Sequence, residues 1–109
     1  MGWVSHLKDA GFTVTTTNVG NITPIKVDND VPKRLFSCHT AMVEGYVIEG
    51  HVPAEDVERL LRERPDVAGL SVPGMPIGSP GMPGPNPKGF QVFSFDENGE
   101  TKVFATHAP

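Results

Sequence analysis

The sequence predicts a single α+β domain. Its 109 residues are the length of one domain and allow one modest core. Alternating apolar runs at 90–95 and 101–106 flank Asn98 and Gly99, a strong turn pair, and predict a hairpin. Pro53 and the acids after it open an amphipathic helix. The predicted order is helix, strand, hairpin, helix, proline-rich loop and hairpin, which is typical of the α+β class.

The first third of the chain predicts a helix, a strand and a loop. Trp3 and Leu7 share one helical face, and Gly11 is a natural stop. The β-branched run 12–17 predicts a strand. The polar stretch 18–30 predicts a loop with room for a short turn of helix.

The middle of the chain predicts a hairpin followed by a helix. Residues 33–39 form the first predicted strand, and residues 42–49, which include Gly45, form a second strand after a tight turn. The helix that opens at Pro53 is expected to end before Pro65. Its apolar stripe consists of Val57, Leu60 and Leu61.

Composition excludes several classes of function. The net charge is −4 and no basic run occurs, so we expect no nucleic-acid partner. No apolar run approaches the roughly 20 residues that a membrane-spanning helix needs. The single cysteine, Cys38, cannot form an internal disulfide. No redox Cys pair, serine elbow, phosphate loop or dinucleotide fingerprint is present, so we expect no enzyme.

Cys38 and His39 are neighbours and form the first candidate metal pair. Thiolate and imidazole bind Zn, Cu and Fe. Neighbours on a strand point to opposite faces, so both bind one ion only if the backbone turns there. The alternative is a buried Cys38 beside an exposed His39.

Two methionines lie in a short internal repeat. Pro-Gly-Met-Pro occurs twice within residues 73–88 and places Met75 and Met82 seven residues apart. Six prolines in these sixteen residues exclude helix and central strand. Thioethers are soft ligands that suit Cu(I) better than Zn. The alternative is that both methionines pack over the core as adaptable hydrophobes.

The remaining histidines differ in their expected roles. His51, just before the second helix, is a candidate ligand that Glu49 could orient, or a surface histidine in a loop. His6 is expected on the solvated side of the first helix, opposite Trp3. His107 is expected to be mobile near the chain end.

A resemblance to known proteins is carried by residues 3–7 with 11–12, 37–41, 45–53, 59–61 and 69–82. Taken together, these segments resemble the bacterial family of unknown function numbered 411, often described as metal-binding. The resemblance covers nearly the whole chain, and the last two segments are the most specific.

The resemblance implies a thioredoxin-like fold over residues 1–109 and a link to copper and other cation resistance. It also implies an exported, periplasmic protein, with a cytoplasmic location as the alternative. In this picture Val31-Pro32 resembles the cis-proline position of thioredoxin-like proteins.

The sequence departs from the family pattern at its start. The pattern has a strand ending in a Cys-Gly-Cys-Cys-type cluster just before Trp3, whereas this chain begins at Met1-Gly2. We therefore expect the first strand to be missing and a sheet edge to be left for a homodimer.

Two functions follow as hypotheses. The first is capture or delivery of Cu(I), with Cys38, Met75 and Met82 as soft ligands and His39 or His51 completing the site. The second is a thioredoxin-like scaffold or interaction module that has lost its metal or redox site.

Overall fold

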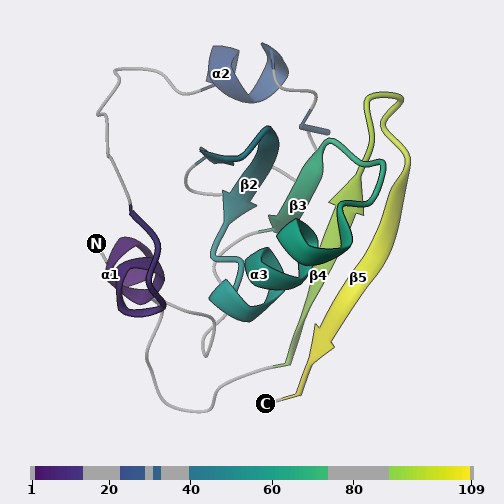
Figure 1. Ribbon diagram of the computed structural model, residues 1–109. Helices are drawn as coiled ribbons and strands as arrows, with labels where there is room; N and C mark the ends of the chain where they lie inside the picture. Colours follow the sequence, from purple (N-terminus) through teal and green to yellow (C-terminus); the bar gives the residue numbers. More distant parts are fainter. Residues whose placement is uncertain (1, 14–22, 29–30, 33–39, 74–88, 109) are drawn as a thin grey trace.

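The computed structural model describes residues 2–13, 23–28, 31–32, 40–73 and 89–108. Within these residues the chain forms one five-stranded sheet with three helices around it (Figure 1). The mixture of helices and strands that the sequence predicts is therefore confirmed.

The sheet is mixed, and its strands lie side by side in chain order. The β2–β3 pair is parallel, and the other three neighbouring pairs are antiparallel. The parallel pair requires a crossover, which α3 (Ala54–Glu63) provides. The strands are β1 (Thr40–Val43), β2 (Tyr46–Gly50), β3 (Gly69–Val72), β4 (Phe90–Phe95) and β5 (Thr101–His107).

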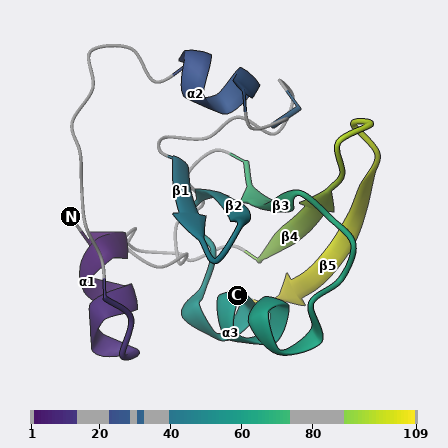
Figure 2. The same ribbon diagram turned by 45° about the horizontal axis from the view of Figure 1, so that its top comes forward.

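Helices lie on both sides of the sheet. Figure 2 shows α2 (Thr23–Asp28) above the sheet and α3 below it. The first helix, α1 (Gly2–Asp9), lies beside the sheet and contributes side chains to the apolar cluster between the sheet and α3. No helix among the described residues is long and apolar enough to cross a membrane.

The main core lies between the sheet and α3. Alternate residues of each strand point to this face because the side-chain period of a strand is two. The cluster combines side chains of α1, the sheet and α3: Trp3, Val4, Leu7, Tyr46, Ile48, Val52, Ala54, Val57, Leu60, Leu70, Val72 and Val92.

The opposite face, toward α2, has a smaller apolar cluster of Val31, Val47 and Phe95. Between its apolar residues lies a polar row, since Thr40 pairs with Glu49 and Glu49 with Ser71 across three strands. The two faces of the sheet therefore have different chemistry.

Three sequence predictions are confirmed in detail. Helix α1 ends before Gly11, whose φ of 96° suits a glycine after a helix. Helix α3 starts after Pro53 and ends in a left-handed Arg64. The terminal hairpin turns at Gly99 (φ 81°), and the Asp96 carboxylate accepts the Asn98 and Glu100 N–H groups.

Parts of two predicted strands are wrong, and other predicted strand residues are not tested. The first hairpin turns at Glu44 and Gly45, both with positive φ, so the turn falls inside the predicted strand 42–49. Phe12 and Thr13 lie outside any strand, while residues 14–17 and the predicted strand 33–39 are outside the described residues.

Strand β3 was not predicted as a strand from its periodicity. Its four residues, Gly-Leu-Ser-Val, are all buried between two neighbouring strands, and the run is too short for its alternation to mark a strand. Gly69 also allows a close approach, because a Cβ there would lie 1.9 Å from the Val47 carbonyl oxygen. No cis peptide bond occurs among the described residues, so the Val31–Pro32 bond is trans, contrary to the resemblance.

Candidate metal centre

Four strands have an end at the same side of the sheet. The parallel strands β2 and β3 both end there, with Gly50 paired to Val72. β1 begins there, with Thr40 paired to Glu49. β4 begins there as well, since Phe90 pairs with His107 at the end of β5. We call this end of the sheet the ligand edge.

Three of the sequence-predicted ligands are close in the sequence to described residues at this edge. Cys38 and His39 directly precede Thr40, and Met75 follows Pro73 by two residues. Two residues of chain span at most about 7 Å between Cα atoms. Cys38, His39, Met75 and Met82 themselves lie outside the described residues.

His51 is the one predicted ligand that the structure describes, and it is buried with 7% of its surface exposed. It follows Gly50, whose φ of 80° turns the chain away from β2 toward α3. The expectation of a surface histidine is therefore wrong. A buried imidazole at the carboxyl ends of two parallel strands occupies a position where α/β proteins commonly bind ligands.

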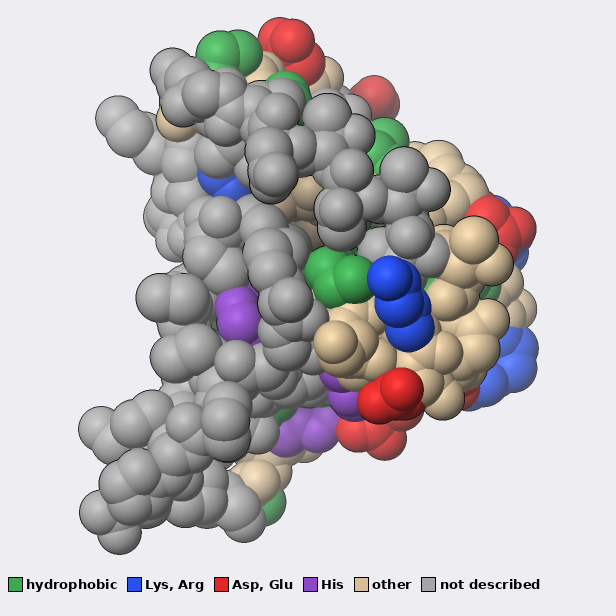
Figure 3. All heavy atoms as spheres, turned by 90° about the vertical axis from the view of Figure 1, so that its left-hand side faces the viewer, with side chains coloured by type: hydrophobic (Ala, Val, Ile, Leu, Met, Phe, Trp, Pro, Cys, Tyr) green, Lys and Arg blue, Asp and Glu red, His purple; other side chains and the backbone are tan. Residues whose placement is uncertain are grey.

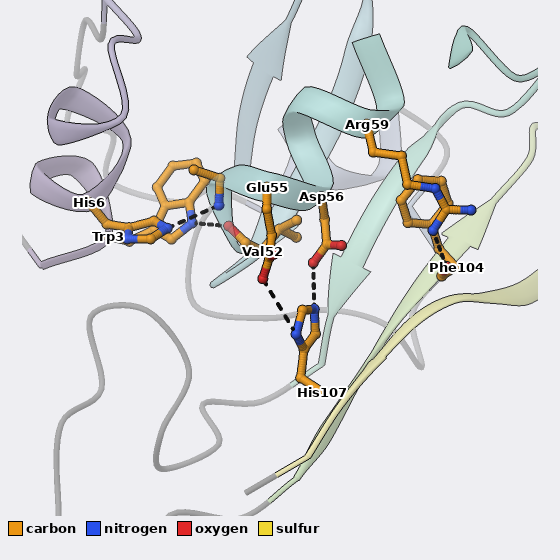
Figure 4. Close-up of polar contacts among 9 residues, drawn as sticks. Trp3, His6, Val52, Glu55, Asp56, Arg59, Phe104 and His107 are labelled. Atoms are coloured by element: carbon orange, nitrogen blue, oxygen red, sulfur yellow. Dashed lines mark hydrogen bonds and ion pairs between the residues drawn. The ribbon is translucent and has the colours of Figure 1, made fainter. Parts of the chain in front are cut away.

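Two side chains of α1 hold the backbone next to His51. The Trp3 indole N–H donates to the Val52 carbonyl oxygen at 2.8 Å. The Ala54 N–H donates to Nε2 of His6 at 3.0 Å (Figure 4). His6 is thus engaged in a hydrogen bond, and the expectation of a solvated side chain opposite Trp3 is wrong. The signal was present in the sequence, because residues three apart share a helical face.

A buried ion pair fixes the entrance to β1. Lys26 of α2 pairs with Glu49 of β2, and the two side chains are 4% and 0% exposed. The Lys26 ammonium also donates to Thr40 Oγ1 at 3.0 Å, and Thr40 Oγ1 donates to Glu49 Oε1 at 2.6 Å. The Glu49 carboxylate, which the sequence offered as a group that could orient His51, is bound to Lys26 and Thr40. The three residues form a closed network at the point where the chain enters β1.

His107, the last residue of β5, is bound to the first turn of α3. Its Nε2 lies 2.7 Å from Asp56 Oδ2, and its Nδ1 lies 3.6 Å from Glu55 Oε1 (Figure 4). Its ring stacks on Phe90, with 4.9 Å between ring centroids. The expected mobility of this residue is therefore wrong. On the face drawn in Figure 3, histidine side chains lie next to acidic ones.

The pKa of Asp56 is raised above its ordinary value. Burial is the largest cause, because it disfavours the charged form. The neighbouring charge of Glu55 also raises the pKa, while the hydrogen bond and charge of His107 and the charge of Arg59 lower it. Burial outweighs the histidine contact at this carboxylate.

A shallow hollow lies at the ligand edge beside His107. Its lining is mainly apolar and includes Val72, Pro73, Phe90 and Phe93. Thioether and imidazole ligands suit such a lining because neither adds a charge to it. Among the described residues no three His, Cys, Asp or Glu side chains gather closely enough to hold a metal ion.

The fold and the ligand edge define a small mixed α/β protein with a buried candidate ligand, His51, at the carboxyl ends of two parallel strands. The family model for proteins of unknown function called DUF411 matches residues 35–82. No protein of curated function matches the sequence.

Two solved structures are similar over nearly the whole chain. "Copper resistance protein copG- Form 2" is 40% identical, with a TM-score of 0.91, covering 97% of this chain and 86% of that one. "Copper resistance protein copG- Form 1" is 39% identical, with a TM-score of 0.92, covering 99% of this chain and 86% of that one. The chain therefore belongs to the DUF411 family of copper-resistance-associated proteins, as the resemblance indicated.

Proposed function

We propose that this protein binds Cu(I) at the ligand edge and captures or delivers the ion without chemical turnover. Cys38, Met75 and Met82 would supply soft ligands, and His39 or His51 would complete a three- or four-coordinate site. The observation that carries this proposal is the convergence of β1, β2 and β3 at the edge where these residues enter or leave the sheet. The similarity to copper resistance proteins supports copper as the ion.

The chemistry of the donors favours Cu(I) over Zn. A thiolate and two thioethers match a soft monovalent ion, whereas structural zinc sites use Cys, His and carboxylate ligands. Buried His51 adds a neutral nitrogen ligand that needs no charge compensation in a low-dielectric setting. Proline on both sides of each methionine restricts the loop and lowers the entropic cost of closing on an ion.

Three finer assignments belong to the same proposal. A thioredoxin-like fold is supported by the mixed sheet with helices on both faces. A periplasmic location follows from the family resemblance and from the role in metal resistance. A homodimer would use the sheet edge at β1 or β5, where Met42 and Val103 are more than half exposed.

The direct test is an anaerobic titration of the reduced protein with Cu(I) against a competing chromophoric chelator. We expect one tightly bound ion per chain and a clear preference over Zn. Cys38→Ser and the double change Met75→Leu with Met82→Leu should each weaken binding at least tenfold. The matched control is Met42→Leu, because Met42 is an exposed methionine of β1 outside the candidate site.

Two results would reject copper binding by these residues. One is a wild-type protein with no measurable Cu(I) affinity, which would favour the scaffold or interaction module. The other is an equal loss of affinity in Met42→Leu and in the double methionine variant, which would place the ion elsewhere.

A further inference from the structure

The backbone corner that carries His51, residues 51–53, lies between two regular elements. β2 ends at Gly50 and α3 begins at Ala54, so the corner lies between the two elements. Within it the Val52 N–H donates to the Gly50 carbonyl oxygen at 3.0 Å, and the Pro53 carbonyl oxygen accepts the Asp56 and Val57 N–H groups of the first turn of α3. Contacts from outside β2 and α3 add to these bonds in holding the corner that carries His51.

Helix α1 holds the corner at two points on either side of Pro53. Trp3 binds the carbonyl of Val52, and His6 accepts the N–H of Ala54. Trp3 is 3% exposed, so its hydrogen bond is made away from water. Leaving the Val52 carbonyl without this donor would cost more than the bond itself contributes.

The second contact replaces a cap that α3 lacks. The N-cap residue of α3 is Pro53, which makes no side-chain capping bond. A helix leaves its first N–H groups without intrahelical partners, and an N-cap side chain usually accepts one of them, at the second or third helical position. Here His6, forty-eight positions earlier in the chain, supplies the acceptor for Ala54.

Apolar burial alone does not fix the register of α1 against the corner. Trp3, Val4 and Leu7 attach α1 to the core, but the hydrophobic effect is non-directional and tolerates small rotations of the helix. Hydrogen bonds weaken steeply when their angle departs from linear, so two of them fix the register of α1 against the corner.

We propose that Trp3 and His6 are the positioning residues of the metal centre, clamping residues 52–54 so that His51 faces the ligand edge. This inference rests on the proposed function, since it assigns His51 as the ligand being positioned. His6 acts with its Nε2 unprotonated, because only that form accepts a hydrogen bond.

The experiment compares three variants of the full chain. His6→Leu removes the acceptor, Trp3→Phe removes the donor but keeps an aromatic ring, and His6→Gln keeps an acceptor that does not titrate. We expect His6→Leu and Trp3→Phe to weaken Cu(I) affinity about five- to tenfold, the size of one hydrogen bond. His6→Gln should bind like the wild type at about pH 7.

A core substitution separates positioning from a general loss of stability. The control is Leu60→Ala, a core change further along α3, which should lower stability and leave the affinity unchanged.

A readout without copper keeps the inference testable if the proposed function fails. In the apo protein, His6→Leu should shift the ring resonances of His51 and speed hydrogen exchange of the Ala54 amide, while Leu60→Ala should leave the His51 ring resonances in place. If the wild type binds no Cu(I) but the variants show these changes relative to it, the proposed function is rejected and the clamp is supported. Unchanged His51 resonances in both His6→Leu and Trp3→Phe would overturn the clamp, whatever the copper result.

Discussion

The two faces of the sheet are built on different physical principles. The face toward α3 is covered by a continuous apolar cluster that includes Ile48, Leu60 and Leu70. The face toward α2 is held by the Lys26–Glu49 pair and by Thr40. Apolar burial supplies most of the free energy of folding, whereas a buried ion pair roughly balances its own desolvation.

Helix α2 shows the contrast most clearly. Its buried side chain is Lys26, while Ile25 and Val27 are 38% and 60% exposed. A short helix attached by apolar packing would have the reverse pattern. We infer that the α2 face is organised to hold Thr40, the first residue of β1, in one arrangement.

The largest effect should come from removing one member of the ion pair. Lys26→Met leaves the Glu49 carboxylate buried without its cation and should lower the free energy of unfolding by about 3–5 kcal/mol. The double variant Lys26→Met with Glu49→Met should recover most of this loss, because apolar residues of similar volume need no desolvation. Urea unfolding measures both effects.

The matched control for the ion pair is Lys8→Met, since Lys8 is an exposed lysine of α1. Its effect should stay within about 0.5 kcal/mol. If Lys26→Met costs no more than Lys8→Met, the pair does not organise the α2 face.

A core substitution tests the other face. Leu60 is fully buried under the sheet, so Leu60→Ala should cost about 2–5 kcal/mol through lost transfer energy and the cavity left behind. Because this change lies in the apolar cluster, Cu(I) affinity measured well below the melting temperature should not change. A copper affinity that falls in proportion to stability would show that the two faces are not independent.

The smallest effect that we expect is the pH dependence of stability caused by Asp56. Burial raises its pKa, so the folded state holds this proton more tightly than the unfolded state. The contribution of this proton to stability therefore grows as the pH falls from the raised pKa of the folded state to the ordinary aspartate pKa of the unfolded state. It is lost as the pH rises through the same interval. The difference in unfolding free energy between wild type and Asp56→Asn should shift in favour of the wild type between about pH 7 and pH 4.

Glu55→Gln is the control for this titration, because the Glu55 side chain is 73% exposed in the same helical turn. The difference in unfolding free energy between wild type and Glu55→Gln should change less over the same pH range. A slope of the opposite sign in Asp56→Asn would mean that the contact with His107 outweighs burial.

Local patterns identified the elements whose signal lies within a few residues. Gly11 ends α1, Pro53 precedes α3, and Asn98-Gly99 forms the last turn, as predicted. The positions of His6 and His107 were misjudged because their partners lie 48 and 51 residues away in the chain. The three-residue spacing of Trp3 and His6 indicates a shared helical face, but no local pattern identifies the distant partner of either histidine.

The sequence by itself determined the mixed class of the fold, its family and the soft character of the candidate ligands. These properties depend on side-chain periodicity, turn residues and donor chemistry, which are local. Only the tertiary structure decided that β3 lies between β2 and β4, that Lys26 is buried against Glu49, and that His51 is buried at the ligand edge. These contacts join segments far apart in the chain, and their energy depends on burial, which a residue acquires only when the other segments pack against it.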